Sequence, residues 1–363
     1  MIGPTLGIYI AWRFAKTLAA MLISLLAIII MIEFVEQIRK AAETTDVSLW
    51  TLLWLSTLKA PILMDKVFPF AGLFAAMLTL TQLNQKMELV VARSAGVSAW
   101  QFLMPISAAA IIVGLFAAFV YNPLAVNSLE ASKDLEAWIY HRAERKPVAD
   151  RAGYWIKQTD GSGTAIINAR IAREFGTRLD VVKILRFDED GTLRERLDAD
   201  AAQFEVGGWQ LHNVTQTTRN ALPMRLADFR LPTELTREIV DGATAVPESV
   251  PFWGLRAAAR KATLAGNNPD PFRVQWHGLL SLPFFLVAMV LIAATVSLRF
   301  IRFGQVGRLV LGGIVSGFLL YAFTQLVTSL GSNGIVPPAI AAWSPSMVAI
   351  LFGFGILLHQ EDG

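Results

Sequence analysis

Long apolar runs occupy both ends of the chain and leave its centre mainly polar. Six runs are visible, at about residues 12–32, 61–83 and 100–121, between Arg273 and Arg299, and at about 309–330 and 339–358. The last two are separated by Pro337-Pro338, within a stretch that carries no charge from Leu309 to Gln360. Because a helix needs about 20 apolar residues to cross the hydrocarbon of a bilayer, the pattern predicts six transmembrane helices, three on each side of the centre.

The central region, residues 122–270, shows the period of two that is typical of strands. Apolar residues alternate at Ile167/Ala169/Ile171, Leu179/Val181/Leu185/Phe187, Phe204/Val206 and Trp209/Leu211. Turn signals separate these segments at residues 160–163, 190–191 and 207–208. Short strands at such spacing predict a sandwich or a jelly roll. Helices are expected to flank it at Ser128–Arg145 and at Phe252–Leu264, the second ending before Gly266.

Composition places the chain among membrane proteins. It is 54% hydrophobic and 17% charged, whereas soluble domains are about 45–50% apolar and about 25% charged. Residues 122–270 hold 20 of the 32 Lys and Arg and 21 of the 29 Asp and Glu, so the centre has a net charge of −1 and the apolar ends one of +4. The basic balance therefore belongs to the membrane part and does not indicate a nucleic-acid partner. A single soluble enzyme is excluded.

Basic residues beside the runs predict the orientation of the chain. With the N-terminus inside, seven Lys or Arg lie in short cytoplasmic segments and two in outer loops. The seven are Arg13, Lys16, Lys86, Arg93, Arg299, Arg302 and Arg308, and the two are Arg39 and Lys40. This bias favours cytoplasmic termini and a central region on the outer side, which in a bacterium is the periplasm. The absence of cysteine is compatible with that placement and excludes disulfides and a thiolate nucleophile.

Catalytic chemistry is poorly represented in the sequence. The four histidines, His141, His212, His277 and His359, are scattered, and the H-E-x-x-H, G-x-S-x-G and P-loop motifs do not occur. We therefore expect no catalytic residue, no metal site and no cofactor. Gly313 and Gly317, in the fifth run, have the spacing of close helix packing, which can equally arise by chance.

Two polar clusters lie at the ends of apolar runs. The first, residues 33–40, reads Glu-Phe-Val-Glu-Gln-Ile-Arg-Lys and follows the first run on the outer side. It is either a solvated helix end or a polar rim at which Glu33, Glu36, Arg39 and Lys40 meet an anionic head group.

The second cluster, within about residues 86–97, connects the second and third runs. It reads Glu-Leu-Val-Val-Ala-Arg-Ser-Ala-Gly at 88–96. An apolar stretch such as Leu89–Ala92 is unusual in a short exposed loop. It indicates either a helix lying on lipid or a short helix that docks on a partner protein, with Glu88 in the first turn, where the helix dipole favours an anion.

Together these segments resemble the lipopolysaccharide-export permeases, the LptF/LptG family. The resemblance covers essentially the whole chain and rests on F-V-E-Q-I-R-K at 34–40, E-L-V-V-A-R-S-A-G at 88–96, G-G-W-Q-L-H-N-V at 207–214 and Q-W-H at 275–277. The closing L-L-H-Q-E-D-G at 357–363 and the first cluster are more similar to the LptG branch than to the LptF branch. One segment alone is a weak signal, whereas the joint pattern is specific.

The resemblance implies an α-helical integral membrane protein with six transmembrane helices, 3 + 3, and an inserted periplasmic all-β jelly-roll domain. The expected domains are residues 1–121, with a coupling helix at about 86–97, residues 122–270, and residues 271–363. The implied function is that of a permease subunit of an ABC-type exporter, which extracts lipopolysaccharide from the bacterial inner membrane. The implied partners are inner-membrane lipid, the sister permease, an ATPase dimer (LptB), the single-span LptC and the periplasmic bridge LptA.

Carried over by position, the resemblance also assigns roles to the two clusters. Glu88, Leu89, Val90, Val91, Ala92, Arg93 and Gly96 match the coupling helix that sits in a groove of the ATPase. Arg39 and Lys40 match a basic pair that faces the glycolipid phosphates. The family pattern has a further lysine where this chain has Glu33. That carboxylate either acts through a bridging divalent ion or lies off the lipid path.

Two other functions compete with a glycolipid exporter subunit. An ion-driven secondary carrier requires ionisable groups buried in the spans, and Asp65 and Lys66 are its candidates, near one end of the second run. An envelope-assembly protein or sensor would have no coupling to an ATPase. Removing acyl chains from a bilayer costs about 0.8 kcal/mol per CH₂, so an exporter needs an energy-supplying partner or a continuous apolar route.

Overall fold

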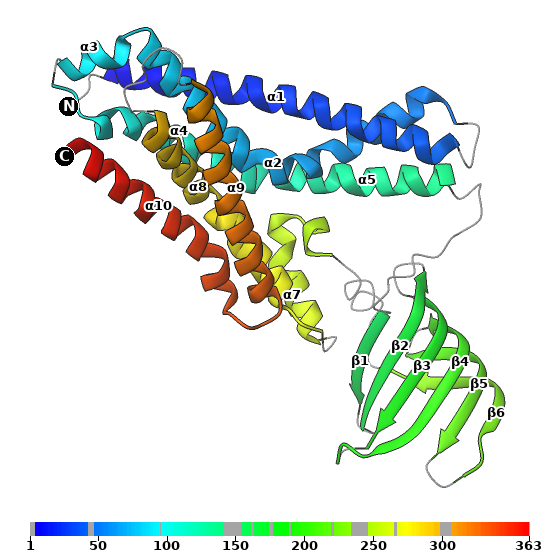
Figure 1. The fold of residues 1–363 in the computed structure, drawn as a ribbon. Helices are drawn as coiled ribbons and strands as arrows, with labels where there is room; N and C mark the ends of the chain where they lie inside the picture. Colours follow the sequence, from blue (N-terminus) through cyan, green and yellow to red (C-terminus); the bar gives the residue numbers. More distant parts are fainter. Residues whose placement is uncertain are drawn as a thin grey trace. The chain divides into compact units, whose positions relative to one another are not determined.

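The structure, a computed structural model, comprises two compact units (Figure 1). The helical unit contains Met1–Ala143, Pro251–Trp253 and Arg273–Gly363, and the β unit contains Glu144–Val250 and Gly254–Phe272. The residues described are 4–42, 47–94, 96–140, 154–160, 163–173, 177–188, 190–205, 207–218, 221–233, 246–264, 267–297 and 306–362. His141, Gly161, Ser162, Val206, Gly266, Arg299 and Arg302, which the sequence singled out, lie outside them.

Within the described residues, six helical stretches are long and apolar enough to cross a membrane. The elements are α1 (Pro4–Ala42), α2 (Leu49–Gln85), α3 (Glu88–Ser94), α4 (Ala99–Phe116), a π-helical segment (Ala117–Tyr121), α5 (Asn122–Tyr140), α7 (Leu255–Leu264), α8 (Asp270–Ser297), α9 (Val306–Ser332) and α10 (Pro338–Asp362). The stretch from α4 through α5 counts as one of the six. The prediction of six spans, three before and three after an inserted domain, is confirmed.

Several helices are longer than a bilayer requires. Helix α1 has 39 residues, about 58 Å at 1.5 Å per residue, whereas the hydrocarbon is about 30 Å thick. Figure 1 shows α5 running beside α1 and α2, and α5 continues α4 without a break in the helix. The expected division after residue 121 therefore falls inside a continuous helix, and the α5 residues belong to the helical unit.

Glycine allows the helices of this unit to approach one another closely. A Cβ at Gly114 of α4 would lie 2.5 Å from Cα of Pro283 in α8. A Cβ at Gly317 of α9 would lie 2.7 Å from Cδ2 of Leu73 in α2, and one at Gly313 would meet the Met77 sulfur. Of the two readings of the Gly313/Gly317 spacing, close helix packing is therefore the one that the structure shows.

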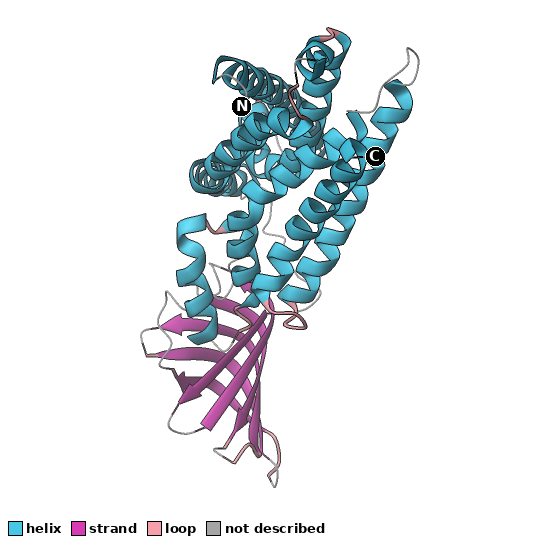
Figure 2. Ribbon diagram, turned by 90° about the vertical axis from the view of Figure 1, so that its left-hand side faces the viewer, coloured by secondary structure: helices cyan, strands magenta, loops and turns pink. Residues whose placement is uncertain are grey.

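The β unit contains one antiparallel sheet of six described strands, paired in sequence order (Figure 2). They are β1 (Tyr154–Asp160), β2 (Gly163–Arg173), β3 (Arg178–Phe187), β4 (Leu193–Glu205), β5 (Gly208–Thr218) and β6 (Met224–Pro232). The inserted all-β domain is confirmed, and its described strands have up-and-down connectivity. The outermost strands are tied together at one end, where the Gln158 side chain of β1 donates to the Pro232 carbonyl of β6 at 2.9 Å.

One face of the sheet forms the apolar core of the β unit. Ile167, Trp209 and Leu211 are fully buried there, as their alternation predicts. Gly207 adopts a φ of +82° in the turn before β5, and the ring of Trp209 packs edge-on against Phe204 at 5.1 Å between centroids. The G-G-W segment of the sequence therefore supplies a tight turn followed by a core anchor.

The alternation predicted for β3 is wrong beyond Leu179. Val181 is 42% exposed with a φ of +52°, and the next buried residues are Val182 and Ile184 instead of Leu185 and Phe187. The alternation of buried and exposed residues also shifts on β4 and β5 beside this point, since Asp180 of β3 pairs with Ala201 of β4, and Ala201 pairs with His212 of β5. The buried positions there run Ala199 then Ala202 on β4, and Leu211 then Val214 on β5. The pairing register is the same on both sides of this level, so β3, β4 and β5 shift their buried faces together and no residue is inserted into one strand.

Candidate functional site

The outer cluster lies on the last turns of α1, where a continuous helix places Glu36, Arg39 and Lys40 on one side. Arg39 Nη2 lies 2.8 Å from a Glu36 carboxylate oxygen, and Lys40 Nζ lies 3.8 Å from the other. These are i,i+3 and i,i+4 pairs, the spacing at which side chains on a helix meet. The Arg39 side chain is 75% exposed. Exposed pairs of this kind are weak, so an anionic ligand can compete for both cations.

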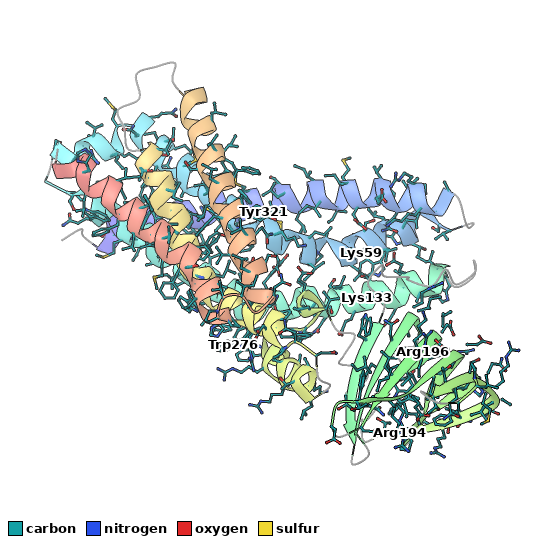
Figure 3. The ribbon with its side chains drawn as sticks, turned by 60° about the horizontal axis from the view of Figure 1, so that its bottom comes forward. Lys59, Lys133, Arg194, Arg196, Trp276 and Tyr321 are labelled. Atoms are coloured by element: carbon teal, nitrogen blue, oxygen red, sulfur yellow. The ribbon has the colours of Figure 1, made fainter. Side chains whose placement is uncertain are left out.

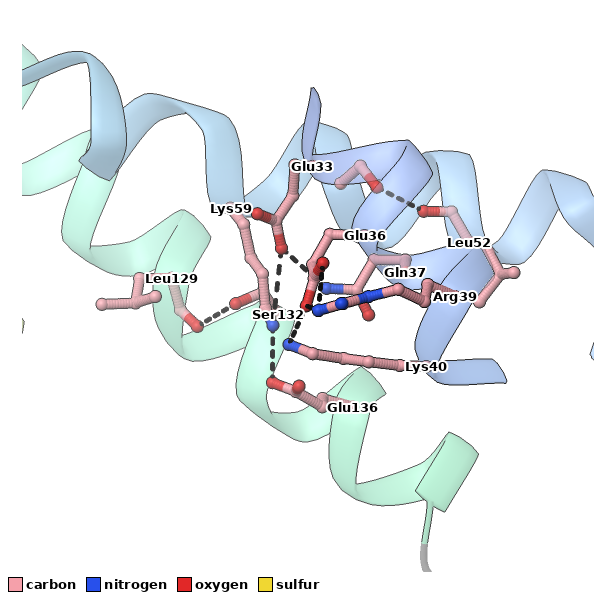
Figure 4. A network of polar contacts seen from close by, with 11 residues as sticks. Glu33, Glu36, Gln37, Arg39, Lys40, Leu52, Lys59, Leu129, Ser132 and Glu136 are labelled. Carbon is pink, nitrogen blue, oxygen red and sulfur yellow. Dashed lines mark hydrogen bonds and ion pairs between the residues drawn. The ribbon is translucent and has the colours of Figure 1, made fainter. Parts of the chain in front are cut away.

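Glu33, one turn earlier on α1, takes part in a different set of contacts (Figure 4). Its Oε1 accepts a hydrogen bond from Gln37 at 2.6 Å and lies 3.9 Å from Lys59 Nζ of α2. Lys59 in turn lies 2.8 Å from Glu136 Oε2 of α5. The side chains of Glu33 and Lys59 are only 17% and 16% exposed. The four residues that sequence reasoning placed in one site therefore divide into Glu36 with its cations Arg39 and Lys40, and Glu33, which contacts Lys59 of α2; Lys59 is the residue that connects α1, α2 and α5.

Sequence reasoning missed Lys59 and Glu136. Lys59 is a lone cation two residues before the apolar run that begins at Pro61. A single charge so close to a membrane span was the signal that could have identified it. A cation beside a membrane span usually has a partner, but Glu136 is remote in sequence. Only the continuation of α4 into α5 brings it to Lys59.

Further polar contacts fasten α5 to α2. The Ser128 hydroxyl donates to the Leu58 carbonyl at 2.8 Å, and the Tyr121 hydroxyl donates to the Pro61 carbonyl at 2.9 Å. Both bonds lie beside Pro61, which has no N–H to donate within α2, and they hold α5 and the preceding π-helical segment against α2.

Asn122 joins three segments of the helical unit at the start of α5. Its amide nitrogen donates to Asp65 Oδ2 at 3.2 Å, and its amide oxygen accepts from the backbone N–H of Phe252 at 3.1 Å. Asp65, the acidic candidate of an ion-driven carrier, thus has an intrachain amide partner. The arrangement holds the residues that precede α8 against α5 and α2.

The second cluster forms α3, a helix of seven residues. Met87 with a φ of +59° precedes it and Gly96 with a φ of +83° follows it, so the chain turns sharply on both sides. Leu89 is buried within the helical unit, whereas Val91 is 65% exposed and Met87 is 59% exposed. The Leu89–Ala92 stretch is therefore not one uniform docking face, because Leu89 anchors α3 to its own chain and Val91 points outward.

Glu88 has partners on α1. Arg13 Nη1 lies 3.2 Å from Glu88 Oε1 and donates to the Tyr9 hydroxyl at 2.8 Å. The Tyr9 hydroxyl donates to Glu88 Oε2 at 3.3 Å. Arg93, at the other end of α3, has a buried Nε for which the described residues supply no hydrogen-bond partner. Of the charged residues of α3, Glu88 is therefore the one tied to another helix.

The part of the chain that the structure describes contains no cluster of side chains that could bind a metal ion. No group of three or more His, Asp or Glu side chains lies there in a position to hold a metal ion. The arrangement instead combines exposed cations at one end of α1 with a short partly exposed helix near the other end.

Comparison with known proteins gives a consistent result along the whole chain. A family model described as lipopolysaccharide export system permease LptF/LptG matches residues 8–359. The chain is 23% identical to the lipopolysaccharide export system permease protein LptG of Haemophilus influenzae over 366 residues, which cover 99% of each protein. It is also 23% identical to LptG of Escherichia coli K12 over 359 residues, 97% of this chain and 98% of that protein.

Proposed function

This chain belongs to the LptF/LptG family of lipopolysaccharide export system permeases, and we propose that it is the LptG-type subunit of an ATP-driven exporter. It is a multi-pass protein of the inner membrane and a transporter subunit. The proposed activity is extraction of lipopolysaccharide from that membrane and its transfer to a periplasmic bridge. The observation that carries the proposal is the pairing of a phosphate-accessible cation cluster on α1 with a short helix suited to dock on an ATPase.

The glycolipid phosphates are proposed to bind Arg39 and Lys40. A guanidinium can bind a phosphate through two parallel hydrogen bonds, and an ammonium adds a mobile point charge. Both cations lie just beyond the first apolar run, at the level expected for outer head groups. The pairs that both cations make with Glu36 lie at the helix surface, where an incoming phosphate can compete with the carboxylate.

The acyl chains require an apolar surface beside this cation pair. Most residues in the most apolar segments of α1 and α9 are not covered by the rest of the chain. Only 6% of that segment is buried in α1, and only 11% in α9. These faces are proposed to contact lipid and the sister permease. Each acyl CH₂ that leaves the bilayer loses about 0.8 kcal/mol, and we propose that the exporter offsets this cost with a continuous apolar route and with energy from ATP.

Energy is proposed to enter through α3. Val91 and Met87 are exposed apolar side chains that are suited to the groove of an ATPase dimer, while Leu89 holds the helix to its own bundle. The N-terminal end of α1, the C-terminal end of α10 and α3 lie at one end of the helical unit (Figure 1). Together with the bias of Lys and Arg, this supports a cytoplasmic location for all three.

The β unit is proposed to be periplasmic and to pass the glycolipid onward, toward LptC and LptA. Its apolar face is closed in this structure, since Ile156, Ile167, Leu179 and Leu231 are at most 1% exposed. Acyl chains can enter only if the sheet opens. Its β1 and β6 edges, joined through Gln158 and Pro232, are the natural place for that opening.

Co-purification with an ATPase tests the proposal. The tagged chain, expressed with its neighbouring genes, should retain an ATPase whose turnover rises when lipopolysaccharide is added. Glu88→Lys, which places a cation beside Arg13, should abolish this association or the stimulated turnover. Full association and stimulated turnover in Glu88→Lys would remove α3 from the coupling role.

A further inference from the structure

Three side chains from two helices form a closed polar triangle at the cytoplasmic end of the helical unit. Arg13 Nη1 lies 3.2 and 3.4 Å from the two carboxylate oxygens of Glu88 and 2.8 Å from the Tyr9 hydroxyl. The Tyr9 hydroxyl completes the triangle with a hydrogen bond of 3.3 Å to Glu88. Arg13 Nη2 also donates to Gln82 Oε1 of α2 at 3.4 Å. One guanidinium therefore connects α1, α2 and α3.

This triangle differs from an ordinary exposed ion pair. The Arg13 side chain is 16% exposed and that of Glu88 is 35% exposed, so salt screens the pair less than it screens a surface pair. Tyr9 and Arg13 are four residues apart and share one face of α1. Arg13 also stands at the start of an apolar run, where a cation without a partner is costly.

Helix α3 depends on such contacts for its orientation. Isolated helices shorter than about 12 residues are marginal in water, and α3 has seven. Leu89 anchors one side of it in the apolar core of the helical unit. The contacts of Glu88 with Arg13 and Tyr9 provide a polar connection between α3 and α1.

We propose that Arg13, assisted by Tyr9, is a positioning residue that fixes Glu88 and ties α3 to the first span. The inference rests on the coupling role proposed for α3. Arg13 and Arg39 lie on the same helix, about 39 Å apart at 1.5 Å per residue. A single helix thus joins the cations proposed to hold lipid phosphates to the helix proposed to receive the ATPase. Arg13 makes that connection rigid at its cytoplasmic end.

The position of α3 can be measured directly in the full chain. The protein has no cysteine, so Ile8→Cys on α1 and Ser94→Cys on α3 allow two spin labels, and their distance distribution can be recorded in lipid nanodiscs. Arg13→Gln should broaden this distribution. Tyr9→Phe should broaden it less, because the ion pair persists. Lys16→Gln, which removes an exposed cation one turn away, is the matched control and should leave it unchanged.

Coupling is measured on the complex with its ATPase in vesicles. Arg13→Gln should lower lipopolysaccharide-stimulated turnover about tenfold, which corresponds to about 1.4 kcal/mol, while the complex still assembles. Arg13→Lys, which keeps the charge, should restore part of the stimulation. Lys16→Gln should behave as the native chain.

The outcomes separate this inference from the proposed function. If Glu88→Gln lowers stimulated turnover and Arg13→Gln does not, Glu88 acts without Arg13, and the inference is overturned while the coupling role stands. If neither variant changes association or turnover, the coupling role itself fails. An unchanged distance distribution in Arg13→Gln overturns the positioning role whatever the turnover shows.

Discussion

At the scale of single residues, the neighbours of a charged side chain decide what it can do. Glu33 and Glu36 are three residues apart on α1, yet Glu36 pairs with exposed Arg39 and Lys40, whereas Glu33 faces Lys59 of α2. Sequence proximity suggested one site for all of them. The positions of α2 and α5, which local sequence does not encode, separate Glu33 from the others.

The contacts of Glu33 predict a structural effect of its substitution. Glu33→Lys places a second cation beside Lys59 and should lower the free energy of unfolding by about 2 kcal/mol, between the values typical of exposed and of buried pairs. Glu36→Lys, on the exposed side of α1, is the control and should cost less. Thermal unfolding in detergent measures both variants. Equal midpoints for native chain and Glu33→Lys would contradict the Lys59 contact.

From the same contacts we predict that Glu33 lies off the proposed lipid path. A chelator should then change lipopolysaccharide capture equally in the native chain and in Glu33→Gln, which removes the charge and keeps the size. A chelator effect in the native chain alone would instead support a divalent ion bridging Glu33 to the lipid.

For Arg39 and Lys40 we predict redundancy. Each contact with a phosphate is worth about 1–3 kcal/mol at most, so single alanine variants should be mild and Arg39→Glu/Lys40→Glu should strongly reduce glycolipid photo-crosslinking. The matched control reverses Arg194 and Arg196, two exposed cations on β4 (Figure 3). An equal loss in the control would show a general charge effect and not a site.

At the scale of elements, the sequence predicts which segments are helices and which are strands. It predicts only in part which face of each element is buried. The six apolar runs and the alternation around Ile167 and Trp209 predict the observed elements. Two local departures do not follow from periodicity. The positive φ of Val181 moves the buried face of β3 by one residue, and Leu89 turns inward from a stretch whose apolar residues look alike. Both depend on tertiary packing.

Close packing of α4 on α8 predicts a severe effect of a small change. Gly114→Ala would place a Cβ against the backbone of Pro283, which cannot rotate away, so we expect a loss of at least about 2 kcal/mol in the range typical of overpacking. Gly317→Ala should cost less, because its nearest neighbour is the end of the Leu73 side chain. Gly278→Ala, with no atom within 4 Å of its Cβ position, should be nearly neutral. Unfolding midpoints that fail to follow this order would contradict the helix packing.

At the scale of the whole molecule, the chain combines a membrane unit and an inserted β unit, a division already visible in the distribution of its charges. The proposed orientation predicts opposite accessibility for two single cysteines in a chain that has none. Leu222→Cys, at a residue 90% exposed in the β unit, should react with an impermeant reagent in intact spheroplasts. Ser94→Cys on α3 should react only after permeabilisation. The reverse pattern would contradict cytoplasmic termini.

Transfer of lipopolysaccharide out of a membrane tests the central claim most directly. The chain is reconstituted with its co-purifying subunits in vesicles that contain labelled lipopolysaccharide, and its appearance on a soluble β-jelly-roll acceptor is followed with and without ATP. We predict ATP-dependent transfer by the native complex, strong loss with Arg39→Glu/Lys40→Glu, and none with Glu88→Lys. A fully assembled native complex that hydrolyses ATP but moves no lipopolysaccharide would contradict the account.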